Sequence, residues 1–270
     1  MRIEDVQPDG NKIYMYCGMN QGDTFITLNL RKKLEEKYQS ELVFIVRTEH
    51  EYVAKLVGDE NYIVVDVDDN IFESTLRNLI SKCREPERGK IFVVNFWLYD
   101  NFKNSGTVRG LYNRFFGLPE DSYLTYNVIP PEMDEALKEK IAKTLSSRKI
   151  VMICPETDCP DPMDIGFWQE IVEKLKVEGY EVVSKVKVKE DALEGTVYLG
   201  MNDSEALQLA YNCHAVYALR NDFCNLCVGL RYKLKVYYSI RNLYNAFSFK
   251  NNYDIHDIEE IIIRDEYYET

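Results

Sequence analysis

Long apolar stretches are missing from this chain of 270 residues, and none approaches the roughly 20 residues that cross a membrane as a helix. The first residues, MRIEDVQPDGNK, lack the basic flank and the apolar run of a signal peptide. Of all residues, 46% are hydrophobic and 29% are charged, which is typical of a folded chain and excludes a largely disordered one. We therefore expect a cytoplasmic protein without a membrane span, and peripheral association with a membrane stays open.

Positive charge is also scarce, because 33 Lys and Arg stand against 45 Asp and Glu, for a formal net charge of -12. A general nucleic-acid binder gains its affinity for phosphate from a basic face. We therefore expect no nucleic-acid partner.

Histidine is scarce as well, with three residues. The chain has seven cysteines, an odd number, and several of them lie in apolar runs. Such cysteines are typical of small core residues and not of a secreted disulfide framework. Cys224 and Cys227 do form a CxxC pair, but a zinc site needs a second pair or a nearby His. A metal or redox protein centred on this pair is one hypothesis. The alternative interpretation is that this CxxC segment is simply the start of a helix, with both thiols half-buried.

Short apolar runs alternate with helical patterns through the first hundred residues, which predicts a largely parallel sheet with right-handed crossovers. The expected strands are 12–17, 41–46, 62–66 and 90–96, and the expected helices are 24–38, 50–57 and 72–83. Segment 97–127 is rich in aromatic residues, Asn and Gly and has no clean period. It is either a surface loop with one irregular helix or a wall of an acceptor cleft.

The sequence VIPPEM at 128–133 stops regular structure and favours a hinge, so we expect one domain over 1–130 and another over 131–270. The second half repeats the β-α order. Its tail from Asn251 onward is acidic but contains several isoleucines, so we expect it to pack against the rest of the domain. Expected strands are 149–154, 180–184, 196–199, 215–219 and, as the last, 234–238, with helices at 134–145, 167–177, 202–212 and 222–230. The fold class is therefore α/β, with two Rossmann-like domains.

Ligands of wound sheets bind beyond the carboxyl ends of the strands, and the first such turn here is CGMNQGDT at 17–24. Gly18 and Gly22 free the backbone of this turn, which does not match the dinucleotide pattern GxGxxG. Asp23 then falls at a helix start. It is either the N-cap of that helix or a carboxylate able to take a proton from an attacking hydroxyl.

The second turn, PETDCPDPMDIG at 155–166, is acidic and has no Lys or Arg. A direct clamp of phosphate by charge is therefore not expected there, although Thr157 and backbone N–H groups could receive a phosphate. The alternative is a long surface loop that ends on Asp164 as a helix cap.

The third turn is RNDFCNLC at 220–227. Arg220, Asn221 and Asp222 place a cation, an amide and a carboxylate at a helix N-terminus, which suits a phosphate or diphosphate. The alternative is that Asp222 caps the helix and pairs with Arg220.

Taken in order, these pieces resemble the heptosyltransferase-type glycosyltransferases. The Gly22-Asp23 turn resembles their N-terminal motif, and Pro155, Trp168 and Gly179 lie as in the start of their nucleotide-sugar domain. The segment 200–239, with Asn221-Asp222 in its turn, resembles their closing donor-site unit. The resemblance implies the GT-B architecture, in which two Rossmann-like domains face a cleft.

The same resemblance implies a role for each turn. The first domain would bind a glycan or glycolipid acceptor beside the loop of Gly18, Asn20 and Gly22, and Asp23 would be the catalytic base. The second would bind a nucleotide-sugar donor, without metal or other cofactor. Its donor-binding residues would be Glu156, Thr157, Arg220, Asn221, Asp222 and Phe223.

The sequence departs from the family pattern at two points. The loop before Trp168 has no Lys, and Phe223, Cys224 and Cys227 stand where the family continues into Ser-Gly and a His. Either Arg220 neutralises the phosphates, or the donor differs, or catalysis has been lost. The prediction is an inverting, metal-independent glycosyltransferase acting on a hydroxyl of a surface glycan. The alternative is a catalytically silent GT-B-like protein that binds a glycan or nucleotide or scaffolds a partner.

Overall fold

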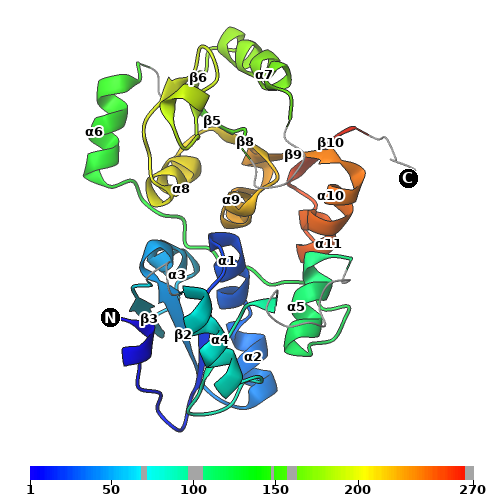
Figure 1. The fold of residues 1–270 in the computed structure, drawn as a ribbon. Helices are drawn as coiled ribbons and strands as arrows, with labels where there is room; N and C mark the ends of the chain where they lie inside the picture. Colours follow the sequence, from blue (N-terminus) through cyan, green and yellow to red (C-terminus); the bar gives the residue numbers. More distant parts are fainter. Residues whose placement is uncertain (68–71, 97–105, 147–148, 157–162, 265–270) are drawn as a thin grey trace. The chain divides into compact units, whose positions relative to one another are not determined.

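The computed structural model describes residues 1–67, 72–96, 106–146, 149–156 and 163–264 of the chain. The chain divides into two compact units, Met1–Ile129 and Pro130–Thr270 (Figure 1). Each unit is built on its own parallel sheet. Within the described ranges, no helix is both long and apolar enough to cross a bilayer.

The sheet of the first unit has the strand order β3-β2-β1-β4, with every pair parallel. The first two strands of the sequence are buried along almost their whole length, as the apolar runs predict for a sheet covered on both faces. The strands are β1 (Ile13–Cys17), β2 (Leu42–Arg47), β3 (Tyr62–Val65) and β4 (Ile91–Val93). The helices are α1 (Gln21–Asn29), α2 (Arg31–Tyr38), α3 (Glu51–Val57), α4 (Phe72–Lys82) and α5 (Val108–Phe116).

Two expected elements of this unit differ in extent. The single helix predicted over 24–38 is two helices, α1 and α2, separated at Leu30, and the first begins earlier, at Gln21. The strand predicted over 90–96 forms ladder pairs only as β4. The earlier helix start matters for function, because it changes which residue caps α1.

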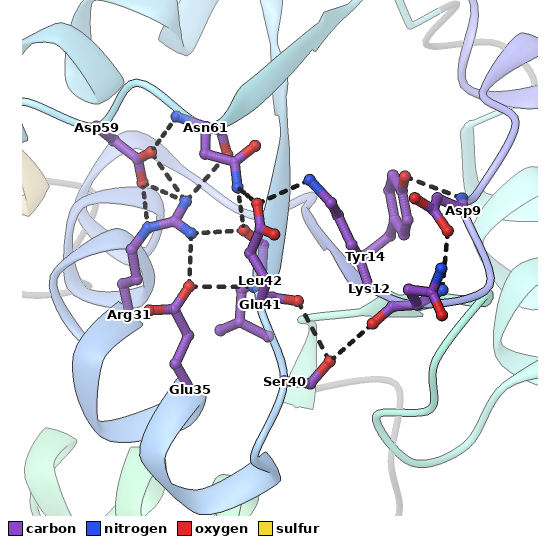
Figure 2. A network of polar contacts seen from close by, with 11 residues as sticks. Asp9, Lys12, Tyr14, Arg31, Glu35, Ser40, Glu41, Leu42, Asp59 and Asn61 are labelled. Atoms are coloured by element: carbon purple, nitrogen blue, oxygen red, sulfur yellow. Dashed lines mark hydrogen bonds and ion pairs between the residues drawn. The ribbon is translucent and has the colours of Figure 1, made fainter.

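Arg31 fastens α2 to the strands of this sheet (Figure 2). Its guanidinium donates to both carboxylate oxygens of Asp59 at 2.7–3.0 Å and to Glu35 Oε1 at 3.1 Å. It also donates to the carbonyl oxygens of Leu42 and Asn61. Only 4% of the Asp59 side chain is exposed, so this is a largely desolvated ion pair. The network locks α2, β2 and the approach to β3 together.

The second unit has six parallel strands in the order β10-β9-β8-β5-β6-β7. Trp168 of α7 is 1% exposed and packs edge-on against Tyr237 of β9, with ring centroids 5.4 Å apart. The strands are β5 (Ile150–Cys154), β6 (Glu181–Ser184), β7 (Val197–Tyr198), β8 (Ala215–Leu219), β9 (Leu234–Ile240) and β10 (Glu259–Arg264). The helices are α6 (Glu135–Thr144), α7 (Ile165–Val177), α8 (Asp203–Asn212), α9 (Asp222–Leu226), α10 (Arg241–Phe247) and α11 (Phe249–Tyr253).

The sequence prediction stopped the sheet too early and made one helix too long. The expected last strand continues to Ile240, and after α10 and α11 the strand β10 joins it in parallel. The tail packs, as its isoleucines indicate: Ile255 and Ile258 are buried. The helix predicted over 222–230 ends at Leu226 and is followed by a 3-10 segment, Val228–Lys233. Arg231 has a φ of 56° inside that segment, which no continuous α-helix allows.

Candidate active site

The loop after β1 leads into α1, which begins at Gln21. The side chain of Asn20 accepts a hydrogen bond of 2.8 Å from the backbone N–H of Asp23, so Asn20 is the N-cap. The structural alternative for Asp23, that of a cap, is therefore wrong. Gly18 is required sterically, because a Cβ there would lie 2.5 Å from a ring carbon of the buried Tyr16. Gly22 lies buried in the first turn of α1.

The carboxylate of Asp23 is half-buried and is held by a residue from α5. The hydroxyl of Tyr112 donates to Asp23 Oδ1 at 2.7 Å. Tyr112 has no exposed surface, and its ring lies edge-on to Phe96 with centroids 5.4 Å apart. The aperiodic segment therefore contains a helix that reaches a candidate catalytic side chain. Whether the segment also forms an acceptor-binding wall stays a prediction.

His50 lies close to the same helix start. Its Nδ1 is 3.3 Å from Oγ1 of Thr24, a side chain that is 1% exposed and that donates to the carbonyl of Asn20. The sequence predicted His50 only as the first residue of a helix over 50–57, so this placement was missed. The available signal was its position shortly after β2, since the carboxyl ends of parallel neighbours meet at one edge.

In the second unit, the turns after β5 and β8 meet because these strands are parallel neighbours. Nδ2 of Asn221 donates to the carbonyl oxygen of Glu156 at 2.8 Å. Oδ1 of Asn221 accepts from the backbone N–H of Cys224 at 3.2 Å, which makes Asn221 the N-cap of α9. The alternative that Asp222 caps this helix is therefore wrong. Two predicted donor-binding residues, Glu156 and Asn221, are in direct contact.

Arg220 is 6% exposed and its guanidinium is directed into the second unit. Its Nε donates to the carbonyl of Phe247 at 3.1 Å, and an Nη donates to Oδ1 of Asn225 at 2.8 Å. The other Nη donates to the carbonyl of Asn221. The side chain thus ties the turn after β8 to the end of α10. These bonds give Arg220 a positioning role in the turn, and its predicted contact with donor phosphates stays a prediction.

The remaining predicted donor-side residues differ in their surroundings. Phe223 is 2% exposed, and Nζ of Lys185 lies 4.8 Å from its ring centroid. Asp222 is half-buried at the start of α9. Asp164 caps α7 by accepting a hydrogen bond of 2.9 Å from the backbone N–H of Gly166. This confirms the cap that the sequence offered as the alternative for this loop. Thr157 lies outside the described residues.

The CxxC pair is fully buried, which corrects the expectation of half-buried thiols. Burial raises the pKa of Cys224 and that of Cys227, so both thiols are held in the protonated form. Cys224 Sγ donates to the carbonyl of Leu219 at 3.5 Å. In the ranges that the structure covers, no three His, Cys, Asp or Glu side chains are grouped to hold a metal. The pair behaves as core cysteines do.

No family model matches the sequence, and no curated protein matches it. The fold, however, is that of glycosyltransferases. The chain superposes on the glycosyl transferase family 9 protein from Veillonella parvula DSM 2008 with a TM-score of 0.58 and 10% identity. That match covers 97% of this chain and 90% of the other.

Two proteins from Escherichia coli share the fold. The ADP-heptose LPS heptosyltransferase II matches with a TM-score of 0.56 and 15% identity, over 94% of this chain and 91% of that one. The iron-containing dodecameric glycosyltransferase TibC matches with a TM-score of 0.54 and 12% identity, over 87% of this chain and 58% of TibC. The predicted class, α/β with two Rossmann-like units, is therefore confirmed, and the resemblance to heptosyltransferases extends to the fold.

Proposed function

We propose that the chain is a glycosyltransferase that moves a sugar from a nucleotide-sugar donor to a hydroxyl of a surface glycan or similar acceptor. The observation that carries the proposal is the half-buried carboxylate of Asp23. It follows β1 in a heptosyltransferase-like fold and is held by Tyr112. TibC has been solved with ADP-D-beta-D-heptose, which supports a donor of the nucleotide-sugar class.

On the acceptor side, Asp23 acts as the general base. Its carboxylate takes the proton of the acceptor hydroxyl while the oxygen attacks the anomeric carbon of the donor. The bond between that carbon and the diphosphate breaks, and the diphosphate leaves with the electron pair. Attack from the face opposite to the leaving group inverts the anomeric configuration. Asn20, as the cap of α1, fixes the backbone that presents Asp23.

On the donor side, Glu156 and Thr157 would contact the nucleotide, and the turn of Asn221, Asp222 and Phe223 would receive the diphosphate. Arg220 contributes by holding this turn in place. Polar groups that are already oriented stabilise the charge that develops on a leaving group at little cost of reorganisation. We propose that such groups act here without a metal. We also propose that the reaction takes place in the cytoplasm, because cysteines in apolar runs are typical of core residues and not of a secreted disulfide framework.

A panel of UDP-, GDP-, CDP-, ADP- and dTDP-sugars, ADP-heptose included, tests the proposal. We expect one donor to raise the melting temperature and to release its nucleotide slowly, and faster with a competent acceptor. Asp23→Asn should keep donor binding and lose transfer. Full transfer activity of Asp23→Asn would refute the assignment of the base.

A second candidate function is supported by the internal engagement of Arg220. Because its guanidinium is committed to two carbonyl groups and Asn225, the turn has less positive charge to offer than the sequence suggested. A catalytically silent protein that binds a glycan or nucleotide, or scaffolds a partner enzyme, would tolerate this. Stabilisation by a donor without any release of nucleotide, with every acceptor tried, would favour this second candidate.

A further inference from the structure

Lys185 follows β6 directly and so leaves the sheet at its carboxyl edge. The strand β6 is the parallel neighbour of β5, and the backbone N–H of Lys185 donates to the carbonyl of Ile153 at 2.8 Å. The turns that contain Glu156 and Asn221 leave the sheet at the same edge. Lys185 therefore belongs, by position, to the group of residues proposed to bind the donor.

The side chain of Lys185 is held in a defined place and stays partly accessible. Its Nζ lies 3.0 Å from a carboxylate oxygen of Asp203, at the start of α8, and 4.8 Å from the ring centroid of Phe223. The side chain is 21% exposed. Burial lowers the pKa of Lys185, but Cys154 and the carboxylates of Asp203 and Glu156 raise it by more, so the ammonium stays charged.

A diphosphate at this edge would meet mainly negative side chains, since Glu156, Asp203 and Asp222 all belong to it. Arg220 is buried and its guanidinium binds internal acceptors. The ammonium group of Lys185 has three N–H donors, and the ion pair with Asp203 uses one of them. Among the described residues, Asp203 is the acceptor paired with this group, so two donors are available there for phosphate oxygens, and the ring of Phe223 helps to hold the cation in place.

We propose that Lys185 binds the diphosphate of the nucleotide-sugar donor and so makes the second unit selective for nucleoside diphosphates over nucleosides. This inference rests on the proposed function. The carboxylate of Asp203 competes with the phosphates for the ammonium group, so Asp203 limits the affinity that Lys185 provides.

The test is calorimetric titration of the whole chain with UDP, GDP, CDP, ADP and dTDP and with the matching nucleosides. For the nucleotide that binds the wild type, Lys185→Met should weaken affinity roughly 10- to 100-fold, because a hydrogen bond to a charged group is lost. Affinity for the nucleoside alone should not change. Asp203→Asn should act in the opposite direction and tighten binding of the diphosphate.

Lys235 provides a matched control. It also pairs with a carboxylate, Glu259, at 2.8 Å and lies 5.1 Å from an aromatic ring centroid, that of Tyr217. It is the second residue of β9 and so lies at the opposite, amino end of the strands. Lys235→Met should bind the diphosphate as the wild type does.

The outcomes separate the inference from the proposed function. If the wild type binds none of the diphosphates, the donor site and the role of Lys185 are both refuted. If the wild type binds one and Lys185→Met binds it equally well, only the role of Lys185 is refuted. If Lys185→Met does not fold, Asp203→Asn decides, and unchanged or weaker binding by that variant overturns the inference.

Discussion

The hydroxyl of Tyr112 donates a hydrogen bond of 2.7 Å to Oδ1 of Asp23, across 89 positions of the sequence. Tyr112 itself is fully buried, so its ring is fixed by packing before any ligand binds. A carboxylate oriented in this way loses little rotational freedom when it acts on a substrate. Asp23 and Tyr112 therefore form a pre-oriented pair, although they come from different helices, α1 and α5.

Tyr112→Phe tests whether this contact matters for the proposed reaction. The substitution removes one hydroxyl and keeps the ring, so the fold should remain, with the free energy of unfolding changed by about 1 kcal/mol. We expect kcat to fall roughly tenfold, with KM for the donor unchanged, because Asp23 is less well oriented. Steady-state kinetics with the identified donor and acceptor measures both.

Tyr52→Phe is the matched control for that experiment. Tyr52 lies on α3, and its hydroxyl donates to Oε1 of Gln21, which is in the same helix as Asp23. Its loss removes a hydroxyl that is bonded to the first residue of α1 and leaves the bond between Tyr112 and Asp23 in place. Equal losses of kcat in the Tyr52 and Tyr112 variants would contradict a specific role for Tyr112.

Arg220→Lys should destabilise the second unit. Lysine cannot reproduce the planar fork that reaches Phe247, Asn221 and Asn225, so at least one buried acceptor loses its donor, at a cost of about 1–3 kcal/mol. Urea unfolding followed by the fluorescence of the buried Trp168, in a Trp97→Phe background, measures it. Arg231→Lys, in a partly exposed pair with Asp257, should change stability by less than about 1 kcal/mol. Similar losses in both variants would refute the role of Arg220.

Arg31→Met should destabilise the first unit by about 3–5 kcal/mol, because it leaves the buried carboxylate of Asp59 without its partner. Adding Asp59→Asn removes the uncompensated charge and keeps an acceptor for the N–H of Asn61. The double variant should therefore recover a large part of the loss. Denaturant titration of the three proteins checks the expectation, and a double variant no more stable than Arg31→Met would contradict it.

Stability should fall at alkaline pH. Burial raises the pKa of Cys213 from 9.0 to about 12, so between these values the unfolded chain has released a proton that the folded chain keeps. The contribution of this thiol is complete below about pH 9 and is lost as the pH rises towards 12. Between these pH values, the unfolding free energy falls with a slope that is proportional to the protons released on unfolding. Cys213→Ala should reduce that slope by up to the contribution of about one proton. Urea titrations between pH 8 and 11 with a reductant measure it, and an unchanged slope in Cys213→Ala would show that this thiol is not responsible.

The order of strands and helices could be predicted because each is a local pattern. Five consecutive apolar residues form β1 and five more form β5, and both are fully buried as such runs predict. The helix caps were harder. Asn20 and Asp23, like Asn221 and Asp222, can all accept from a helix N–H, and the backbone path out of the strand decides which one does. In both turns it is the Asn.

The sequence alone determined that two α/β units follow one another, and that polar turns after β1, β5 and β8 are where chemistry could occur. Hydrophobic periodicity is a property of neighbouring residues, so one chain suffices to read it. Only the tertiary structure decided the partners of the charged groups. Tyr112 donates to Asp23, and Arg220 donates to the carbonyl of Phe247 at the end of α10. Both contacts exist because packing brings together segments that are far apart in the sequence. Lys185, an ordinary lysine in the sequence, thereby becomes a cation at the carboxyl edge of the second sheet.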